Sequence, residues 1–581
     1  MTPPLRELID QALSTAMRQA EIPPEHKPIL VYATNDRFGD YQANGILAAA
    51  KQLKKNPREL AQKVVDRLCA PPGIPEFIKQ VEVAGPGFIN IHINPTWLGQ
   101  RLSAAKGDIY SLIPRPGNKR VVVVDYSGPN LAKEMHVGHL RSTIIGDSLV
   151  RVFTALGFTV IRQNHVGDWG TQFGMLIAHM TDLKSQGDTL KSELADLEAF
   201  YRDAKKRFDS DAPFSQRARQ FVVKLQSGDS ECLAHWREFI AVSLTHCFKV
   251  YQRLGVLLTE ADLKPESSFN PALHGIVAEL EAKGFITESD GAKCVFLEEF
   301  VGKDKQPLPI IVQKSDSGFL YATTDLAALK HRVNDLHATR ILYVVDVRQG
   351  LHFEQIFTLA RKARLVPPDC MLEHIAFGTM LGKDGKPFKT RTGDTVKLEA
   401  LLDEAIERAA KIVTLKSPEL SESDKEQIAR TVGINAVKYA DLSRNRKTNY
   451  IFDWDTLLAL DGNTAPYLMY AYARIQSILR QSQLTELPHT LALATVEEIR
   501  LALKIIQLPE VLGDIAEDCM LNNLCQYLFE LSGDFMSFYE KCPVLKAEPT
   551  TRNSRLALCQ ATANTLRVGF ELLGLVVIER M

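Results

Sequence analysis

The 581-residue sequence lacks several features that define broad protein classes. Its nine cysteines include no C-x-x-C pair, which argues against a disulfide scaffold or a structural zinc site and favours reduced, mostly buried thiols. No run of about 18 apolar residues occurs, and the first twenty residues carry Glu7 and Asp10 where a signal peptide would be apolar. The net charge is only −1. These absences predict a cytoplasmic protein without membrane segments.

Because the net charge is so small, any contact with nucleic acid must come from local basic patches. Two stretches qualify, residues 51–67 and residues 444–447, both rich in Lys and Arg. Each could bind RNA or could be a solvated face, and the local sequence favours neither.

Hydrophobic periodicity predicts a multidomain chain that is α/β in its first two parts and all-α afterwards. Residues 1–115 form an N-terminal α/β domain and residues 116–400 a Rossmann-type, doubly wound parallel sheet. A helical insertion at about residues 181–296 interrupts this sheet. Helical patterns then continue without strands, and divide into a connecting segment, 401–452, and a C-terminal bundle, 453–581. Expected strands lie at residues 29–33, 88–92, 121–124, 159–162, 310–314, 340–345 and 374–377.

One segment joins a buried strand to a helix. The strand's four valines, 121–124, are followed by Ser127-Gly-Pro-Asn-Leu-Ala-Lys-Glu-Met-His-Val-Gly-His139. Sheets of this class bind nucleotides at the carboxyl ends of strands, and helix N-termini favour phosphate. His136 and His139 share one face of the first helical turn, while Gly138 leaves a gap for a base or ribose. Alternatively, both histidines are surface residues or helix caps.

The string S-G-P-N-x-A-K-x-M-H-V-G-H-L-R-S closely resembles the arginyl-tRNA synthetases, class I enzymes with a "HIGH" motif, and the bacterial type in particular. The resemblance runs nearly end to end. It implies that arginine and ATP form arginyl-adenylate and that the arginyl group passes to the 3′ end of tRNA(Arg), with tRNA bound first. Residues 1–115 would contact the tRNA elbow and residues 453–581 the anticodon. A monomer is expected, with Mg²⁺ arriving on ATP phosphates and no metal site in the protein.

Donors to the phosphates are the first requirement of that reaction, because negative charge accumulates there in the transition state. His136 and His139 are the expected donors, and the resemblance gives Lys133 part of the work. The family's second clamp, a "KMSKS" loop, corresponds to residues 382–393 but departs from the pattern. Its remaining cations, also expected to be catalytic, are Lys386, Lys389 and Arg391. A solvent-facing hairpin is the alternative for this loop. The expected ATP-binding set is Pro129, His136, Gly138, His139, Gly378 and Met380.

Arginine recognition requires acceptors, since a guanidinium has five donors and no acceptor. The candidates are Asp125, Ser127, Asn130, Tyr321, Asp325 and Gln349. By resemblance, Asn130 holds the amino or carboxylate end, and the last three surround the side chain. A buried carboxylate at Asp325 would favour a cation, although this residue could instead cap the following helix.

In the C-terminal bundle, Tyr467, Tyr470 and Arg474 form a stripe at helical spacing. Such stripes are usually core. The resemblance instead implies tRNA binding by stacking of anticodon bases, with Tyr539 and Met581 as further contacts.

Two rival functions stay open. One is another H-x-G-H nucleotidyl transferase, which the helical C-terminal third and the pair Asn130 and Asp325 disfavour. The other is a non-catalytic tRNA-binding paralogue, which the irregular loop at residues 382–393 favours and the intact His136 and His139 disfavour.

Overall fold

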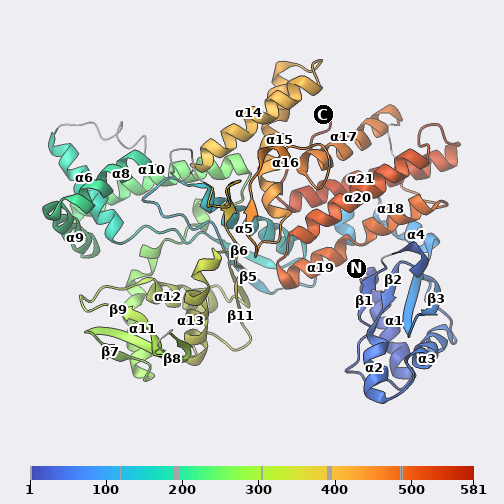
Figure 1. The fold of residues 1–581 in the computed structure, drawn as a ribbon, viewed down its shortest axis with the longest axis horizontal. Coiled ribbons are helices and arrows are strands. Elements are labelled where there is room, and N and C mark those ends of the chain that lie inside the picture. The colour runs from blue at the N-terminus through green and yellow to red at the C-terminus, as the bar shows by residue number, and fades with distance from the viewer. Residues whose placement is uncertain are drawn as a thin grey trace. The chain divides into compact units, whose positions relative to one another are not determined.

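A computed structural model describes residues 3–33, 35–117, 119–186, 197–302, 305–388, 396–484, 486 and 488–581. The chain divides into two compact units. The first comprises Met1–Pro116, Ala459–Glu571 and Val576–Met581, and the second Gly117–Leu458 with Leu572–Leu575. Figure 1 shows the elements of both. None of the helices in the described ranges combines the length and apolar character needed to cross a membrane.

The second unit contains the predicted parallel sheet. Its strands are β5 (Val121–Asp125), β6 (Thr159–Gln163), β10 (Arg340–Tyr343) and β11 (Met371–His374), in the order β11-β10-β5-β6. All neighbours are parallel. Val122, Val123 and Val124 of β5 are buried, as expected for a strand covered on both faces. Helix α5 (Val137–Ala155) follows β5 and carries the histidine motif at its start.

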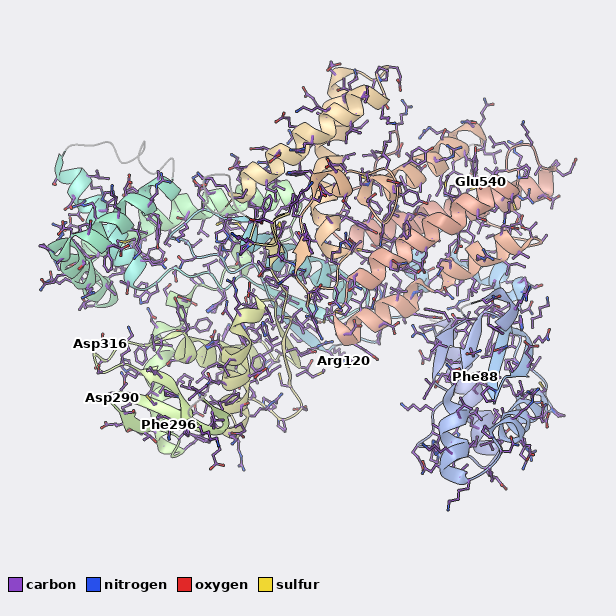
Figure 2. All side chains as sticks on the ribbon, viewed as in Figure 1. Phe88, Arg120, Asp290, Phe296, Asp316 and Glu540 are labelled. Carbon is purple, nitrogen blue, oxygen red and sulfur yellow. The ribbon has the colours of Figure 1, made fainter. Side chains whose placement is uncertain are left out.

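A second, smaller sheet corrects the strand predicted at residues 310–314. That stretch belongs to β9 (Pro307–Gln313), which pairs antiparallel with β8 (Ala292–Val301), and β8 pairs with β7 (Thr287–Ser289). It is not part of the parallel sheet. Figure 2 labels Asp290, Phe296 and Asp316 around this small sheet. The last parallel strand, predicted at 374–377, ends at His374 instead.

Helices cover these sheets. Buried apolar residues of α11 (Asn270–Ala282), α12 (Tyr321–Asn334) and α13 (Gly350–Lys362) form one cluster with the small sheet and with β10. The predicted insertion begins within α6 (Thr171–Gln186) and contains α8 (Leu197–Ser210), α9 (Ala212–Gln226) and α10 (Ser230–Leu254), drawn in blue-green to green in Figure 1. It also includes β7 and the start of β8, so that it is not purely helical.

The segment after the sheet is helical, but it contains a strand that the sequence did not predict. Helices α14 (Leu398–Lys416), α15 (Glu422–Leu442) and α16 (Trp454–Leu457) are interrupted by β13 (Tyr450–Ile451). This strand pairs in parallel with β12 (Met380–Leu381). The expectation that strands stop after Leu401 was therefore wrong by one short strand.

The first unit combines an antiparallel sheet with helices. The sheet order is β1-β2-β4-β3, from β1 (Leu30–Tyr32), β2 (Tyr41–Ala43), β4 (Phe88–Ile93) and β3 (Ile78–Ala84). Its N-terminal helices are α1 (Leu5–Gln19), α2 (Gly45–Leu53), α3 (Pro57–Cys69) and α4 (Pro95–Ala105). The C-terminal helices are α17 (Ala465–Gln481), α18 (Val496–Ile506), α19 (Leu508–Asp518), α20 (Asn522–Lys541) and α21 (Pro549–Leu572). Of the nine cysteines only Cys69 is exposed, which confirms that most of the thiols are buried.

Candidate active site

A cavity of about 580 Å³ lies where β5 and β10 end, the edge of a parallel sheet at which ligands bind. It is lined by residues that follow both strands and by residues of α5, α12 and α13. Most of the predicted ligands of ATP and arginine line it: Asp125, Ser127, Asn130, His136, Gly138, His139, Tyr321, Asp325 and Gln349. The structure thus brings together residues that lie more than 200 positions apart in sequence.

The two motif histidines are locked by backbone hydrogen bonds at the start of α5. His136 is the N-cap residue, and its Nδ1 accepts from the N–H of Gly138 at 3.0 Å. His139 Nδ1 accepts from the N–H of His136 at 3.1 Å, and the ring centroids are 4.1 Å apart. Because Nδ1 is the acceptor in both neutral rings, both carry their proton on Nε2. The capping role considered from sequence is therefore real, and it leaves both Nε2–H groups as donors.

Both imidazoles are neutral near pH 7. Burial, together with the nearby Lys133 ammonium, lowers the pKa of His136. Burial and then the charge of His136 lower the pKa of His139 to about 3. Lys133 itself lies beside the motif, with Nζ 4.3 Å from the ring centroid of Tyr201. The site therefore presents two neutral donors next to one fixed cation.

Gly138 does not leave the gap that the sequence suggested. A Cβ atom at this position would lie 2.7 Å from Cε1 of His136. The space beside the glycine is occupied by the histidine ring, which needs it to reach the Gly138 N–H. The missing side chain thus serves the cap, and the expectation of a base or ribose packing there is not supported.

Ser127 forms the turn out of β5 in a left-handed conformation, with φ of 71°. Its Oγ lies 2.7 Å from the hydroxyl of Tyr251 and accepts from the hydroxyl of Thr143 at 2.9 Å. Its N–H donates to the hydroxyl of Ser142. An uncommon backbone conformation at a non-glycine residue persists only when its surroundings hold it, and here hydroxyl groups from α5 and α10 do so.

Asp125, at the end of β5, reaches the pocket as half of an ion pair. Its Oδ2 accepts from Nη2 of Arg332 at 2.7 Å, and Arg332 is fully buried. Arg332 also donates to Gln163. The carboxylate of Asp125 is thereby largely neutralised by the protein's own guanidinium, which the sequence pattern did not reveal.

Asp325 lies inside helix α12, four residues after its start, so that the helix-cap alternative is wrong. Its Oδ2 is 2.6 Å from Nε2 of His352, and its side chain is 14% exposed. Sequence reasoning missed both His352 and the neighbouring Glu266, which also line the pocket. Burial, followed by the charges of Asp168 and Asp325, raises the pKa of Glu266 to about 8. This wall therefore carries the carboxyl groups of Asp325 and Glu266, and Arg348, a cation that also lines the pocket, is paired with Asp346.

The other predicted arginine ligands lie nearer to solvent. Tyr321 is 64% exposed, and Gln349 is exposed at the end of the short helix Val347–Gln349. Asn130 is half-buried and uses its Oδ1 to accept the N–H of Ala132, which fixes the turn before the histidines. His165 and Gly167, from the Asn164–Gly174 stretch, complete the wall near Asn130.

Several predicted ATP ligands are not part of the pocket lining. Pro129 is buried and its carbonyl accepts from Gly167 N–H. Gly378 and Met380 lie at the base of a hairpin, and Lys386 is exposed in its turn. Residues 380–388 form a hairpin, in which the Gly382 N–H donates to the Lys386 carbonyl and Leu381 bridges Pro387. Lys389 and Arg391 lie outside the described residues.

Three of the predicted anticodon residues, Tyr470, Arg474 and Tyr539, are in contact with one another in the first unit. Tyr470 is 40% exposed, and its hydroxyl accepts from Nη1 of Arg474 at 2.8 Å. The Arg474 guanidinium lies 4.6 Å from the ring centroid of Tyr539. Tyr467 is half-buried against Phe529 and Met581 is half-buried. Tyr470 therefore does not belong to a fully buried aromatic stripe.

Arg446, in one of the two basic patches, is buried and donates to the Ala376 carbonyl. It is therefore not part of an exposed RNA-binding patch. Over the described ranges, no group of three or more His, Cys, Asp or Glu side chains is arranged to hold a metal ion.

Three family profiles match nearly the whole chain. The profile described as the class I (R) tRNA synthetase catalytic domain matches residues 106–454. The DALR anticodon binding domain matches residues 468–581, and the arginyl-tRNA synthetase N-terminal domain matches residues 4–93.

Individual relatives agree over their full length. The chain is 53% identical to the arginine–tRNA ligase of Hahella chejuensis and 51% identical to that of Saccharophagus degradans, with 99% of this chain and 100% of each relative covered. Among solved structures, the arginyl-tRNA synthetase of Plasmodium falciparum matches with a TM-score of 0.85 at 30% identity, covering 99% of each chain. That of Thermus thermophilus matches with a TM-score of 0.84 at 26% identity, covering 99% of this chain and 100% of that one.

Proposed function

This chain belongs to the class I arginyl-tRNA synthetases, and from that membership we propose that it is an arginine–tRNA ligase. Arginine and ATP react to arginyl-adenylate and pyrophosphate, and the arginyl group then passes to the 3′ end of tRNA(Arg). The observation that carries the proposal is the joint lining of one cavity by the histidine motif and by the carboxyl groups of Asp325 and Glu266. The histidine motif offers donors to phosphate, and the carboxylate of Asp325 offers an acceptor to a guanidinium.

The donors act on charge that develops during adenylation. Attack of the arginine carboxylate on the α-phosphorus builds negative charge on the phosphate oxygens as pyrophosphate leaves. Two Nε2–H groups held by backbone hydrogen bonds need no reorganisation to meet that charge. A neutral imidazole keeps its Nε2–H donor. Because it carries no positive charge, it does not attract a carboxylate before ATP binds. Lys133 adds a positive charge beside them, and Lys386, Lys389 and Arg391 supply the second clamp.

The acceptors select arginine by charge. A neutral amino acid would leave the carboxylate of Asp325 buried without a cation, which costs free energy. The hydrogen bond to His352 orients that carboxylate, and Tyr321 and Gln349 border the entrance. Asn130 and Ser127 also line the cavity, and Ser127 is hydrogen-bonded to the helix that carries the motif, so we assign them to the α-amino and carboxylate groups of arginine.

The remaining assignments follow the family. Tyr467, Tyr470, Arg474, Tyr539 and Met581 bind the anticodon loop of tRNA(Arg), and residues 1–115 the tRNA elbow. Mg²⁺ arrives with ATP, because phosphate oxygens are among its preferred ligands. The monomeric state, the cytoplasmic location and the domain limits at 115, 400 and 452 stay predictions.

Charging of tRNA tests the proposal directly. Purified protein, total tRNA, ATP and Mg²⁺ are incubated with each radiolabelled amino acid in turn, and label in acid-precipitable tRNA is counted. The proposal requires label with arginine alone. Label with another amino acid would indicate a different class I synthetase. Tight tRNA binding without label would indicate the non-catalytic paralogue.

A further inference from the structure

Arg141 lies on helix α5, five residues after the N-cap residue His136, and is only 2% exposed. A buried guanidinium is costly unless its donors are used. Here Nε forms an ion pair with the carboxylate of Asp441, at 3.0 Å to Oδ2, and Asp441 is itself buried. Nη1 donates to two carbonyls, those of Gly378 at 2.7 Å and Thr448 at 3.2 Å.

These two carbonyls mark the base of the hairpin at residues 380–388. Gly378 lies two residues before β12, and Thr448 lies two residues before β13, the strand that pairs with β12. The two backbones are in close contact, since a Cβ at Gly378 would lie 2.5 Å from the Thr448 carbonyl oxygen. The planar guanidinium therefore ties together the two chain segments from which the hairpin emerges.

The hairpin is rigidly joined to this base. Phe388 N–H donates to the Met380 carbonyl, and Leu381 bridges Pro387. Phe388 and Phe452 pack with ring centroids 5.0 Å apart. A shift of the base would therefore displace the whole turn that carries Lys386. Phe377, next to Gly378, lines the cavity and also lies against the Arg141 guanidinium.

A second link joins the motif to the chain beyond the loop. The N–H of Val137 donates to the Val396 carbonyl, and the N–H of Leu398 donates to the Met135 carbonyl. Lys397 forms an ion pair with Glu134 at 3.1 Å. Residues that precede and residues that follow the basic loop are thus both fixed to the segment that carries His136 and His139.

We propose that Arg141 is a positioning residue for ATP, which holds the Phe377–Phe388 segment in register with the histidine pair. It does not touch the reacting atoms. It fixes the positions of Lys386 and Phe377 relative to His136 and His139, the donors at the start of the helix that carries Arg141. This inference rests on the proposed function, because it assigns Lys386 to the phosphates.

The variant Arg141→Lys tests this inference. Lysine keeps the charge beside Asp441 but cannot donate to both carbonyls as well. We expect ATP-pyrophosphate exchange with arginine and tRNA to lose about 100-fold in kcat/KM for ATP, the scale of a misplacement of about 1 Å. The KM for arginine stays within about twofold of the wild-type value, because the acceptors lie on other elements.

A double-mutant cycle shows whether Arg141 acts through the hairpin. Lys386→Ala should weaken ATP use in the wild-type background but have little further effect in Arg141→Lys. Independent, multiplying effects would overturn the inference, as would a Lys386→Ala variant with unchanged kinetics. Absence of arginine-dependent exchange in the wild-type protein would refute the proposed function instead.

Arg555→Lys is the matched control for loss of stability. Arg555 on α21 also joins a buried carboxylate, Glu498 at 2.7 Å, to a carbonyl, that of Pro543. It lies in the other unit. We expect both lysine variants to lower Tm, but only Arg141→Lys to change the KM for ATP. Equal losses of kcat/KM for ATP in the two variants would overturn the inference and show that Arg141 has only a structural role.

Discussion

The backbone N–H of His136 donates to Nδ1 of His139, so that the first motif histidine fixes the ring of the second. His136 in turn is fixed by the N–H of Gly138. The H-x-G-H spacing is therefore a hydrogen-bonded unit, in which the glycine admits one ring and the helix start orients both. The unit determines which nitrogen of each ring remains as a donor.

Loss of either donor should reduce the rate of adenylation. We expect His136→Ala and His139→Ala each to lower kcat by raising the activation free energy of adenylation by about 2–4 kcal/mol. This is the size of the effect of losing one donor to a developing oxyanion. Rapid-quench measurement of adenylate formation reports this step. The control is His136→Asn, whose side chain can still cap the helix. It should keep the wild-type Tm and still lose activity. Full activity of this variant would assign His136 to capping alone.

The lowered pKa values predict how the pair responds to acid. A histidine whose pKa is depressed in the folded state stays neutral below pH 6.5, where the unfolded chain takes up a proton. Stability from His139 is therefore lost as the pH falls from about 6.5 toward 3, by up to about 1.4 kcal/mol per pH unit. NMR of ¹⁵N-labelled imidazoles should show an Nε2-protonated His139 that does not titrate between pH 7.5 and 5.5, with His139→Gln providing the assignment. Titration near pH 6.5 would contradict this.

Charge at Asp325 should decide arginine use. We expect Asp325→Ala to lower kcat/KM for arginine, with a loss of at least about 2 kcal/mol in transition-state stabilisation. This is the scale of losing one partner of a buried charged contact. Asp325→Asn separates charge from shape, since asparagine can still hydrogen-bond to His352. Both variants should keep the KM for ATP. Unchanged arginine kinetics in either variant would remove the charge of Asp325 from substrate recognition.

The tyrosine cluster of α17 should act on tRNA and not on folding. Tyr470→Ala is expected to raise the KM for tRNA(Arg) at least tenfold, about 1.4 kcal/mol, since stacking on an aromatic face contributes about 1–3 kcal/mol per base. The KM values for arginine and ATP should not change. Tyr472→Ala is the matched control, because Tyr472 lies on the same helix but is only 5% exposed. It should lower Tm, and Tyr470→Ala should not. A lower Tm for Tyr470→Ala but not for Tyr472→Ala would show that Tyr470 is a core residue.

The sequence predicted best what local physics determines. Four successive valines can hardly be anything but a buried strand, and the turn and helix that follow gave the position of the pocket edge correctly. The strand at residues 307–313 was assigned to the wrong sheet, because a short apolar run does not say which neighbour it pairs with. The same holds for β13, whose two residues pair only because β12 is brought beside them.

The candidate site was predicted where family motifs carry it and missed where it depends on folding. Nothing in the sequence around Arg332 says that it neutralises Asp125, 207 positions away. Glu266 and His352 likewise become pocket residues only through the packing of α12 and α13 beside the sheet. Arg141 is a mid-helix arginine in the sequence, and only its burial reveals that it joins the motif helix to the hairpin base.

ATP-pyrophosphate exchange with each of the twenty amino acids, with and without total tRNA, tests the central claim most directly. The claim predicts exchange with arginine alone, and only when tRNA is present. Asp325→Asn should abolish most of it while leaving tRNA binding intact. No exchange with arginine in either condition, while tRNA still binds, would contradict the claim and leave a tRNA-binding protein without the chemistry.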